Sequence, residues 1–184
     1  MADLIPNLAD RWPAAPDWSA ATLEGAGVSV RSVAGLRQML VSGNLDAWNA
    51  ASGLTGPGVG ALAPAKGKAW QLRVARDRLL AVSEKPFKVE PGWHDEGFAA
   101  TRMDAALHVF EVEGEGLGGI VARATTLDPA GRSPSAAMLF AGVNAVVYRR
   151  GSADRLRVHV DRGLAAYLWE WFGQATGEAA RQMS

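Results

Sequence analysis

Side chains suited to proton transfer or metal binding are scarce in this sequence. The histidines, which titrate nearest to neutral pH, are His94, His108 and His159, and none stands in an H-x-H or H-E-x-x-H spacing. Cysteine is absent, which removes thiol catalysis, disulfides, iron–sulfur clusters and cysteine-ligated zinc. We therefore expect the histidines to be structural or to lie at the surface, and we predict no metal site.

One polar cluster lies beside an aromatic residue. His94-Asp95-Glu96 follows Trp93 in a stretch that begins with prolines. A histidine next to carboxylates could serve acid–base chemistry, and the same residues also suit a solvated loop. Glu111, Glu113 and Glu115 alternate at the end of a predicted strand, which is typical of a solvent-facing edge. No G-x-S-x-G elbow occurs, so we predict no catalytic residue on this chain.

A glycine motif raises the question of nucleotide binding. Gly114–Gly119 matches G-x-G-x-x-G literally, after a predicted strand and before a predicted helix. A dinucleotide site also needs an acidic residue about 20 residues further on, for a ribose hydroxyl. The next strand ends at Asn144 instead, and no acid occurs between Asp128 and Asp154. We therefore interpret the motif as a tight turn leading into a helix.

Composition excludes several classes of protein. The chain carries 19 basic and 19 acidic side chains, so it lacks the basic excess on which nucleic-acid binding draws. Arg149, Arg150, Arg155 and Arg157 are interpreted as a solvated hairpin face. No run reaches the roughly 18 apolar residues of a membrane span, and the N-terminus has no basic region ahead of an apolar run, unlike a signal peptide. With no cysteine, the cytoplasm is favoured.

Hydrophobic periodicity predicts a single domain over residues 1–184 that contains strands, hairpins and interspersed helices. The predicted strands are 28–33, 36–41, 69–75, 79–83, 105–112, 136–143, 145–148 and 155–160. The predicted helices are 45–51 with Asn44 as N-cap, one within 114–126, and one from Asp161 to about Ala175. Hairpins dominate over strict strand–helix alternation, so we expect an α+β fold with antiparallel sheets and packed helices.

The last predicted helix carries an apolar stripe. The stripe consists of Leu164, Tyr167, Leu168, Trp171 and Ala175. Trp169 lies about 140° from the centre of that stripe at 100° per residue. A large aromatic side chain away from the core face indicates a second contact surface.

The two ends of the chain look irregular. Residues 1–25 form a predicted arm rich in proline that contains Trp12 and Trp18, and residues 176–184 form a polar tail. Proline at this density blocks regular helix and strand interiors. The two tryptophans are too apolar to remain in water, so we expect them to lie either against this domain or against a partner chain.

The C-terminal half resembles a known family. The run LDPAGRSPSAAMLFAGVNAVVYRRGSADRLRVHVDRGLAAYLWEWFGQA is similar to the end of gamma subunits of heterotetrameric sarcosine oxidase. The likeness covers roughly residues 65–175 and rests on pattern and spacing. Its landmarks are Leu127-Asp128, Ser135-Ala136-Ala137, Ala145–Arg149, Leu156–Val160, and Arg162 ahead of Tyr167-Leu168-Trp169.

The resemblance implies a fold similar to the folate-binding domain of aminomethyltransferases. It also implies a complex that demethylates sarcosine to glycine, forms hydrogen peroxide and passes the one-carbon unit to tetrahydrofolate. FAD, FMN, NAD, zinc and tetrahydrofolate would then be held by alpha, beta and delta-type partner subunits, with no cofactor on this chain. The chain itself would be an assembly subunit.

Two hypotheses follow. In the first, the chain is a structural subunit that docks through Trp12, Trp18, Trp93 or Trp169, and it could self-associate when isolated. In the second, it is a standalone folate-binding protein like an aminomethyltransferase, with Asp104 or Asp128 as the carboxylate that holds the pterin. A central cavity with a buried carboxylate would favour the second, and a filled centre would oppose it.

Overall fold

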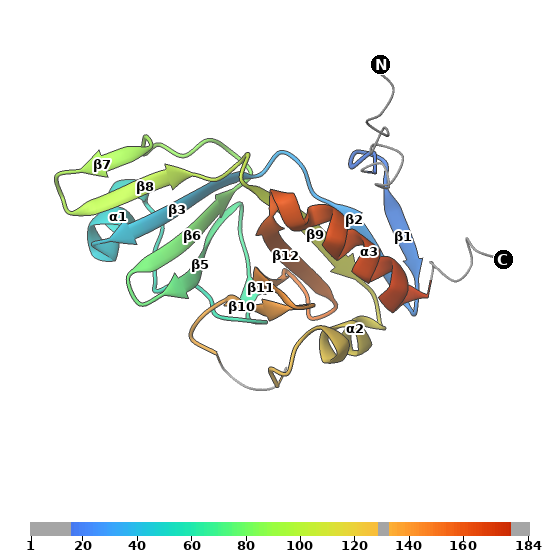
Figure 1. Cartoon of the computed structure of the whole chain (residues 1–184). Helices are drawn as coiled ribbons and strands as arrows, with labels where there is room; N and C mark the ends of the chain where they lie inside the picture. Colours follow the sequence, from blue (N-terminus) through green and yellow to red (C-terminus); the bar gives the residue numbers. More distant parts are fainter. Residues whose placement is uncertain (1–15, 129–132, 178–184) are drawn as a thin grey trace, which may run out of the picture.

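The fold was analysed in a computed structural model that describes residues 16–128 and 133–177. Within these residues twelve strands form two sheets, and three α-helices lie against them (Figure 1). An inner strand of each sheet is buried at consecutive positions, over residues 79–83 and 108–112. Both faces of each sheet are therefore covered at these strands.

The larger sheet contains the strands that enclose the candidate site. In spatial order it consists of β1 (Thr22–Gly25), β2 (Val28–Ser32), β9 (Leu107–Glu113), β12 (Arg155–Asp161), β11 (Val143–Arg150) and β10 (Ala137–Phe140). The short strand β4 (Pro64–Ala65) pairs with β11 in parallel, and every other pair in this sheet is antiparallel. Because β9 and β12 pair over seven residues, the centre of the sheet is its most continuous part.

The smaller sheet is wholly antiparallel. Its spatial order is β5 (Ala69–Ala75), β6 (Arg78–Ser83), β3 (Arg37–Gly43), β8 (Phe98–Arg102) and β7 (Gly92–His94). The β5–β6 hairpin turns at Arg76-Asp77, as the sequence pattern predicted, with a register shift between Arg73 and Ala75. Strand β7 lies at the outer edge of this sheet, so one side of its backbone has no strand partner among the described residues.

Three helices cover the outer faces of the sheets. They are α1 (Leu45–Ser52), α2 (Leu117–Ala124) and α3 (Ala165–Thr176), the last preceded by a 3₁₀ turn at Arg162–Leu164. Asn44 caps α1 as predicted, since its Oδ1 accepts a hydrogen bond from the Ala47 amide at 3.1 Å. In the described residues no helix is long and apolar enough to cross a membrane.

The elements stack as helix, sheet, sheet and helix. Trp48 of α1 packs on Met39 and Val41, on the outer face of the smaller sheet. The inner face of that sheet presents Leu72 and other apolar side chains toward the larger sheet. The far face of the larger sheet carries a third cluster beneath α2 and α3, and Figure 1 shows α3 lying across that sheet. The predicted α+β architecture with antiparallel sheets is confirmed.

Several short strands escaped the sequence analysis. Strand β1 lies inside the arm predicted to be irregular, and β4, β7 and β8 fall outside the predicted strands. These segments are two to five residues long, and β7 follows directly after Pro91. Strands this short present too few positions for a two-residue alternation to be recognised. They form because the longer neighbouring strands provide hydrogen-bonding edges for them.

The buried face of the last helix differs from the predicted one. Leu164 is 39% exposed and Tyr167 is also exposed, whereas Leu168 and Phe172 are fully buried. Leu164 belongs to the 3₁₀ turn, which advances about 120° per residue rather than 100° and so rotates the stripe. Trp169 is therefore not directed away from the core, because it packs against that core and its ring lies 5.8 Å from the ring of Phe110.

The glycine motif is explained by close packing of two turns. A Cβ on Gly116 would lie 1.8 Å from the carbonyl oxygen of Ala26, and one on Gly114 would lie 2.2 Å from that of Gly27. The Gly116 amide donates a hydrogen bond to the Gly27 oxygen at 3.0 Å. These two glycines are needed so that the β1–β2 turn can pack on the start of α2. This is the tight turn that the sequence analysis favoured over a dinucleotide site.

Candidate functional site

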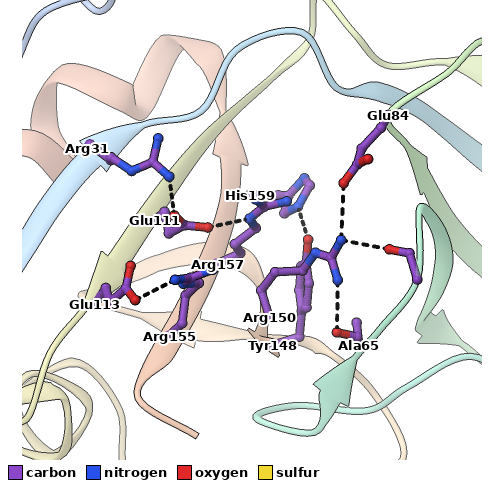
Figure 2. Close-up of polar contacts among 11 residues, drawn as sticks. Arg31, Ala65, Glu84, Glu111, Glu113, Tyr148, Arg150, Arg155, Arg157 and His159 are labelled. Carbon is purple, nitrogen blue, oxygen red and sulfur yellow. Dashed lines mark hydrogen bonds and ion pairs between the residues drawn. The ribbon is translucent and has the colours of Figure 1, made fainter. Parts of the chain in front are cut away.

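The space between the two sheets is where a ligand cavity would have to lie, and polar side chains of the larger sheet fill it (Figure 2). The strand register sets their order. Arg157 of β12 is paired with Glu111 of β9 on one side and with Tyr148 of β11 on the other. One row further along, Arg155 is paired with Glu113. Opposite charges thus face each other across neighbouring strands.

Glu111 is the most buried charge of this set. Its carboxylate is 1% exposed and accepts hydrogen bonds from Arg157 Nε at 2.9 Å and from Arg31 Nη2 at 2.5 Å. The prediction that Glu111 lies on a solvent-facing edge is therefore wrong, because the smaller sheet covers this face. Glu113 is 41% exposed and pairs with Arg155, and so it matches the prediction better.

A chain of hydrogen bonds connects the two sheets through His159. Its Nδ1 lies 2.6 Å from Oε1 of Gln38 on β3, and its Nε2 lies 3.1 Å from the Tyr148 hydroxyl. An amide oxygen only accepts, so Nδ1 carries the proton and Nε2 accepts from Tyr148. Burial, with the positive Arg157 nearby, lowers the pKa of His159 to about 3. Burial raises the pKa of Tyr148 to about 12.

Burial favours the uncharged form of both side chains. Near neutral pH both His159 and Tyr148 are uncharged, and neither exchanges a proton readily in that range. A general acid or base needs a pKa close to the working pH, which burial here prevents. The expectation of a structural histidine holds for His159, whose hydrogen bonds tie β12 of the larger sheet to β3 of the smaller one.

Arg150 closes the same space from the other side. Its guanidinium carbon lies 4.1 Å from the centre of the Trp70 ring. It also donates to the carbonyl oxygens of Ala65 and Gly67, at 3.3 and 2.7 Å, and pairs with Glu84 (Figure 2). The interpretation of the arginine cluster as a solvated face is therefore wrong for Arg150 and Arg157. Their charges are used inside the fold rather than offered to a ligand.

The two carboxylates proposed for folate lie apart from this centre. Asp104 Oδ1 accepts from the Gln38 amide at 2.6 Å, and Oδ2 lies 3.3 Å from Arg37. Asp104 lines two pockets of about 270 and 180 Å³, which Asp128 does not reach. Ligand sites usually enclose about 300 Å³ or more. Asp128 is exposed after α2. A folate role for either residue stays a prediction, and Asp104 already has both oxygens engaged.

Two of the tryptophans predicted to be interface anchors pack inside this chain. The rings of Trp18 and Trp169 lie 5.7 Å apart, edge to face. Trp18 also packs 4.6 Å from His108, whose Nε2 is 3.1 Å from the Ser32 hydroxyl. Burial lowers the pKa of His108 to about 4. Trp12 lies outside the described residues.

Trp93, unlike Trp18 and Trp169, is exposed to solvent. It is 70% exposed and stands on the edge strand β7. The neighbouring Asp95 and Glu96 are exposed in the β7–β8 turn, and His94 stacks on Phe98. The His94-Asp95-Glu96 cluster is therefore a solvated turn. Within the described ranges no three His, Asp or Glu side chains gather as they would around a metal ion.

Comparisons with known proteins agree with this description of the fold. No model of a protein family matches the chain, and no curated protein matches it in sequence. Among solved structures, it is similar to a chain of the heterotetrameric sarcosine oxidase from Corynebacterium sp. U-96, determined in complex with pyrrole 2-carboxylate. The TM-score is 0.68 at 17% sequence identity, over 87% of this chain and 89% of that one.

The likeness therefore extends over nearly all of both chains. Because the two shares are almost equal, the two chains are similar in length. The class that the structure defines is a two-sheet α+β domain whose central space is filled. Its fold is that of a chain in a heterotetrameric sarcosine oxidase, which is the structural resemblance that the sequence predicted.

Proposed function

We propose that this chain is a non-catalytic structural subunit of a sarcosine oxidase-type flavoenzyme complex. The observation that carries the proposal is the shared fold, which spans nearly the whole of this chain and of a chain in a heterotetrameric enzyme. A match of that extent leaves little of this chain for any separate domain. It supports an equivalent place in a similar assembly.

The filled space between the sheets supports the non-catalytic part of the proposal. Glu111 has two guanidinium partners, and His159 and Tyr148 are both held uncharged. Each of these three buried titratable groups is engaged in joining strands or sheets. The same filled space argues against the standalone folate-binding hypothesis, which requires a central cavity.

The remaining parts of the proposal come from the sequence resemblance. The partners are alpha, beta and delta-type subunits in the cytoplasm, and they hold FAD, FMN, NAD, zinc and tetrahydrofolate. The complex converts sarcosine to glycine and transfers the one-carbon unit to tetrahydrofolate. On this account the chain contributes packing surface, and the chemistry takes place on its partners.

The test is purification of the tagged chain from its native cells under mild conditions. We expect flavoprotein and zinc-binding chains to co-purify in fixed ratio, and the eluate to show the visible absorbance of flavin. If the chain elutes alone and colourless, the proposal fails. Titration of that isolated chain with tetrahydrofolate would then examine the folate-binding hypothesis directly.

A further inference from the structure

Trp93 is the one tryptophan of the described residues whose side chain lies mainly in water. Trp48 and Trp70 are buried, and Trp18, Trp169 and Trp171 are partly buried. A tryptophan offers about 150–250 Å² of surface for burial, so leaving most of it exposed forgoes a large hydrophobic stabilisation. Tryptophan is also among the residues most enriched at the energetic centres of interfaces. The exposed ring is therefore a candidate for burial in an interface.

The hairpin segment Glu90–Gly97, which presents Trp93, is held in place from several sides. His94 stacks on Phe98 with ring centres 4.4 Å apart and planes 10° from parallel, and its Nε2 lies 3.0 Å from the Glu90 carbonyl oxygen. From the start of α1, Asn44 donates through its backbone amide to the Gly97 oxygen at 2.9 Å and through Nδ2 to the Glu96 oxygen at 3.1 Å. A backbone held in this way loses little conformational freedom on docking.

The segment that carries the exposed ring is acidic in sequence. Glu90, Asp95 and Glu96 are all exposed, and the segment Glu90–Gly97 contains no lysine or arginine. The chain as a whole carries 19 basic and 19 acidic residues, so this is a local excess rather than a general one. Charges at the rim of an interface steer association and select a partner of opposite sign. The arrangement fits an apolar pocket with a basic rim.

We propose that Trp93 anchors this chain to a partner subunit, by inserting into an apolar pocket that is bordered by lysine or arginine side chains. The inference rests on the proposed function, since it identifies the surface through which the subunit joins the complex. It also separates Trp93 from Trp18 and Trp169, whose rings pack on one another within this chain.

The first test places a photoreactive benzophenone amino acid at position 93 of the tagged chain in its native cells. A matched control places it at Leu139, which is 62% exposed on β10 of the other sheet. We expect position 93 to cross-link to a co-purifying flavoprotein or zinc-binding subunit, at a peptide containing lysine or arginine, and position 139 to give no such product. Cross-linking of position 93 to a second copy of this chain would overturn the proposal.

The second test compares retention of the partner subunits by variants. Trp93→Ala should weaken association at least tenfold, as should the combined change Glu90→Lys, Asp95→Lys and Glu96→Lys, with the charge variant most impaired at low salt. Leu139→Ala should bind as the wild type does. Urea unfolding should show equal stability for Trp93→Ala and wild type, since the ring is exposed.

The outcomes separate this inference from the proposed function. If the wild-type chain recovers the flavoprotein complex and Trp93→Ala recovers it equally well, the anchor is refuted while the subunit assignment stands. If the wild-type chain recovers no flavoprotein, the subunit assignment fails and the anchor fails with it.

Discussion

Two glutamates on β9, two residues apart, differ sharply in what their carboxylates do. Glu111 is buried and joins Arg31 and Arg157, whereas Glu113 pairs with Arg155 near solvent. Removing one partner of a buried ion pair leaves an uncompensated charge, which costs about 3–5 kcal/mol. A pair near solvent contributes about 0–1 kcal/mol, because water and salt screen it.

We therefore predict that Glu111→Gln lowers the free energy of unfolding by about 3–5 kcal/mol and that Glu113→Gln lowers it by about 1 kcal/mol or less. Urea denaturation of both variants measures the difference. Equal losses for the two variants would mean that Glu111 is not buried between the sheets.

The low pKa of His159 predicts how stability depends on pH. In the unfolded chain a histidine takes up a proton below a pH of about 6.5, whereas folded His159, with a pKa of about 3, stays neutral. The unfolded state therefore binds more protons as the pH falls below about 6.5, and stability falls at up to about 1.4 kcal/mol per pH unit. His108, with its pKa lowered to about 4, acts in the same direction.

In His159→Gln this titration is removed while a side chain capable of hydrogen bonding remains. Between pH 7 and 5 we predict that the variant loses about 2 kcal/mol less stability than the wild type does. Tyr148→Phe is the control, since it costs about 1 kcal/mol at each pH and keeps His159 titratable. Unfolding curves at several pH values measure how the free energy of unfolding depends on pH. If this dependence is the same in His159→Gln and in the wild type, the lowered pKa of His159 is contradicted.

For single residues, the sequence did not show the surroundings of the buried polar groups. The absence of motif spacing around the histidines led to an expectation of structural roles, which holds for His159. The burial of Glu111 and Arg157 was missed, because alternation along one strand shows that a face exists but not that a second sheet covers it. His159 bonds to Gln38, 121 positions away in sequence.

Among the elements, α3 gives the clearest test of local packing. The apolar stripe predicted from sequence placed Leu164 and Leu168 together on the core face, but only Leu168 is fully buried. We predict that Leu168→Ala costs about 2–5 kcal/mol through the cavity that it leaves, and that Leu164→Ala costs about 1 kcal/mol or less. Thermal and urea unfolding of this matched pair would show which of the two side chains is buried. A greater loss of stability in Leu164→Ala than in Leu168→Ala would support the stripe predicted from the sequence instead.

The start of α2 offers a second matched pair. Gly116→Ala would place a methyl group against the Ala26 oxygen, 1.8 Å away, whereas a Cβ on Gly119 meets nothing within 4 Å. We predict that Gly116→Ala destabilises the protein by about 3 kcal/mol or more. Gly119→Ala should stabilise it by up to about 1 kcal/mol, because alanine favours the helix.

Urea denaturation measures both glycine variants. Similar, small effects at the two positions would contradict the close packing of turns. A glycine required for phosphate approach would instead leave stability unchanged and affect only ligand binding, so the stability readout distinguishes the two explanations of the motif.

Element prediction succeeded where segments were long and failed where they were short. The β5–β6 hairpin and helix α1 follow directly from alternation and from the Asn44 cap. Strands β1 and β7 have four and three residues and depend on neighbours that are distant in sequence. The rotation of α3 arises from the 3₁₀ turn before it, whose presence no local pattern announces.

In the whole molecule, the two sheets meet through apolar side chains and one polar network. The proposed structural role rests in part on this filled centre. Its ion pairs join Arg31 on β2 and Arg157 on β12 to Glu111, and its hydrogen bonds join Tyr148 on β11 through His159 to Gln38 on β3. The sequence indicated the fold class and the family resemblance, because both depend on the order of elements. It could not show whether the centre was open, since that depends on contacts between distant strands.

The most direct test of the account deletes the gene for this chain in the native cells. Both the amount of assembled flavoprotein complex and its sarcosine turnover per flavin are then measured. If the chain is a structural subunit, we expect the amount of assembled complex to fall several-fold. Sarcosine turnover per flavin in the complex that still assembles should stay within about twofold of the wild-type value. A complex that assembles in full without this chain, yet turns over no sarcosine until the chain is restored, would contradict a non-catalytic role.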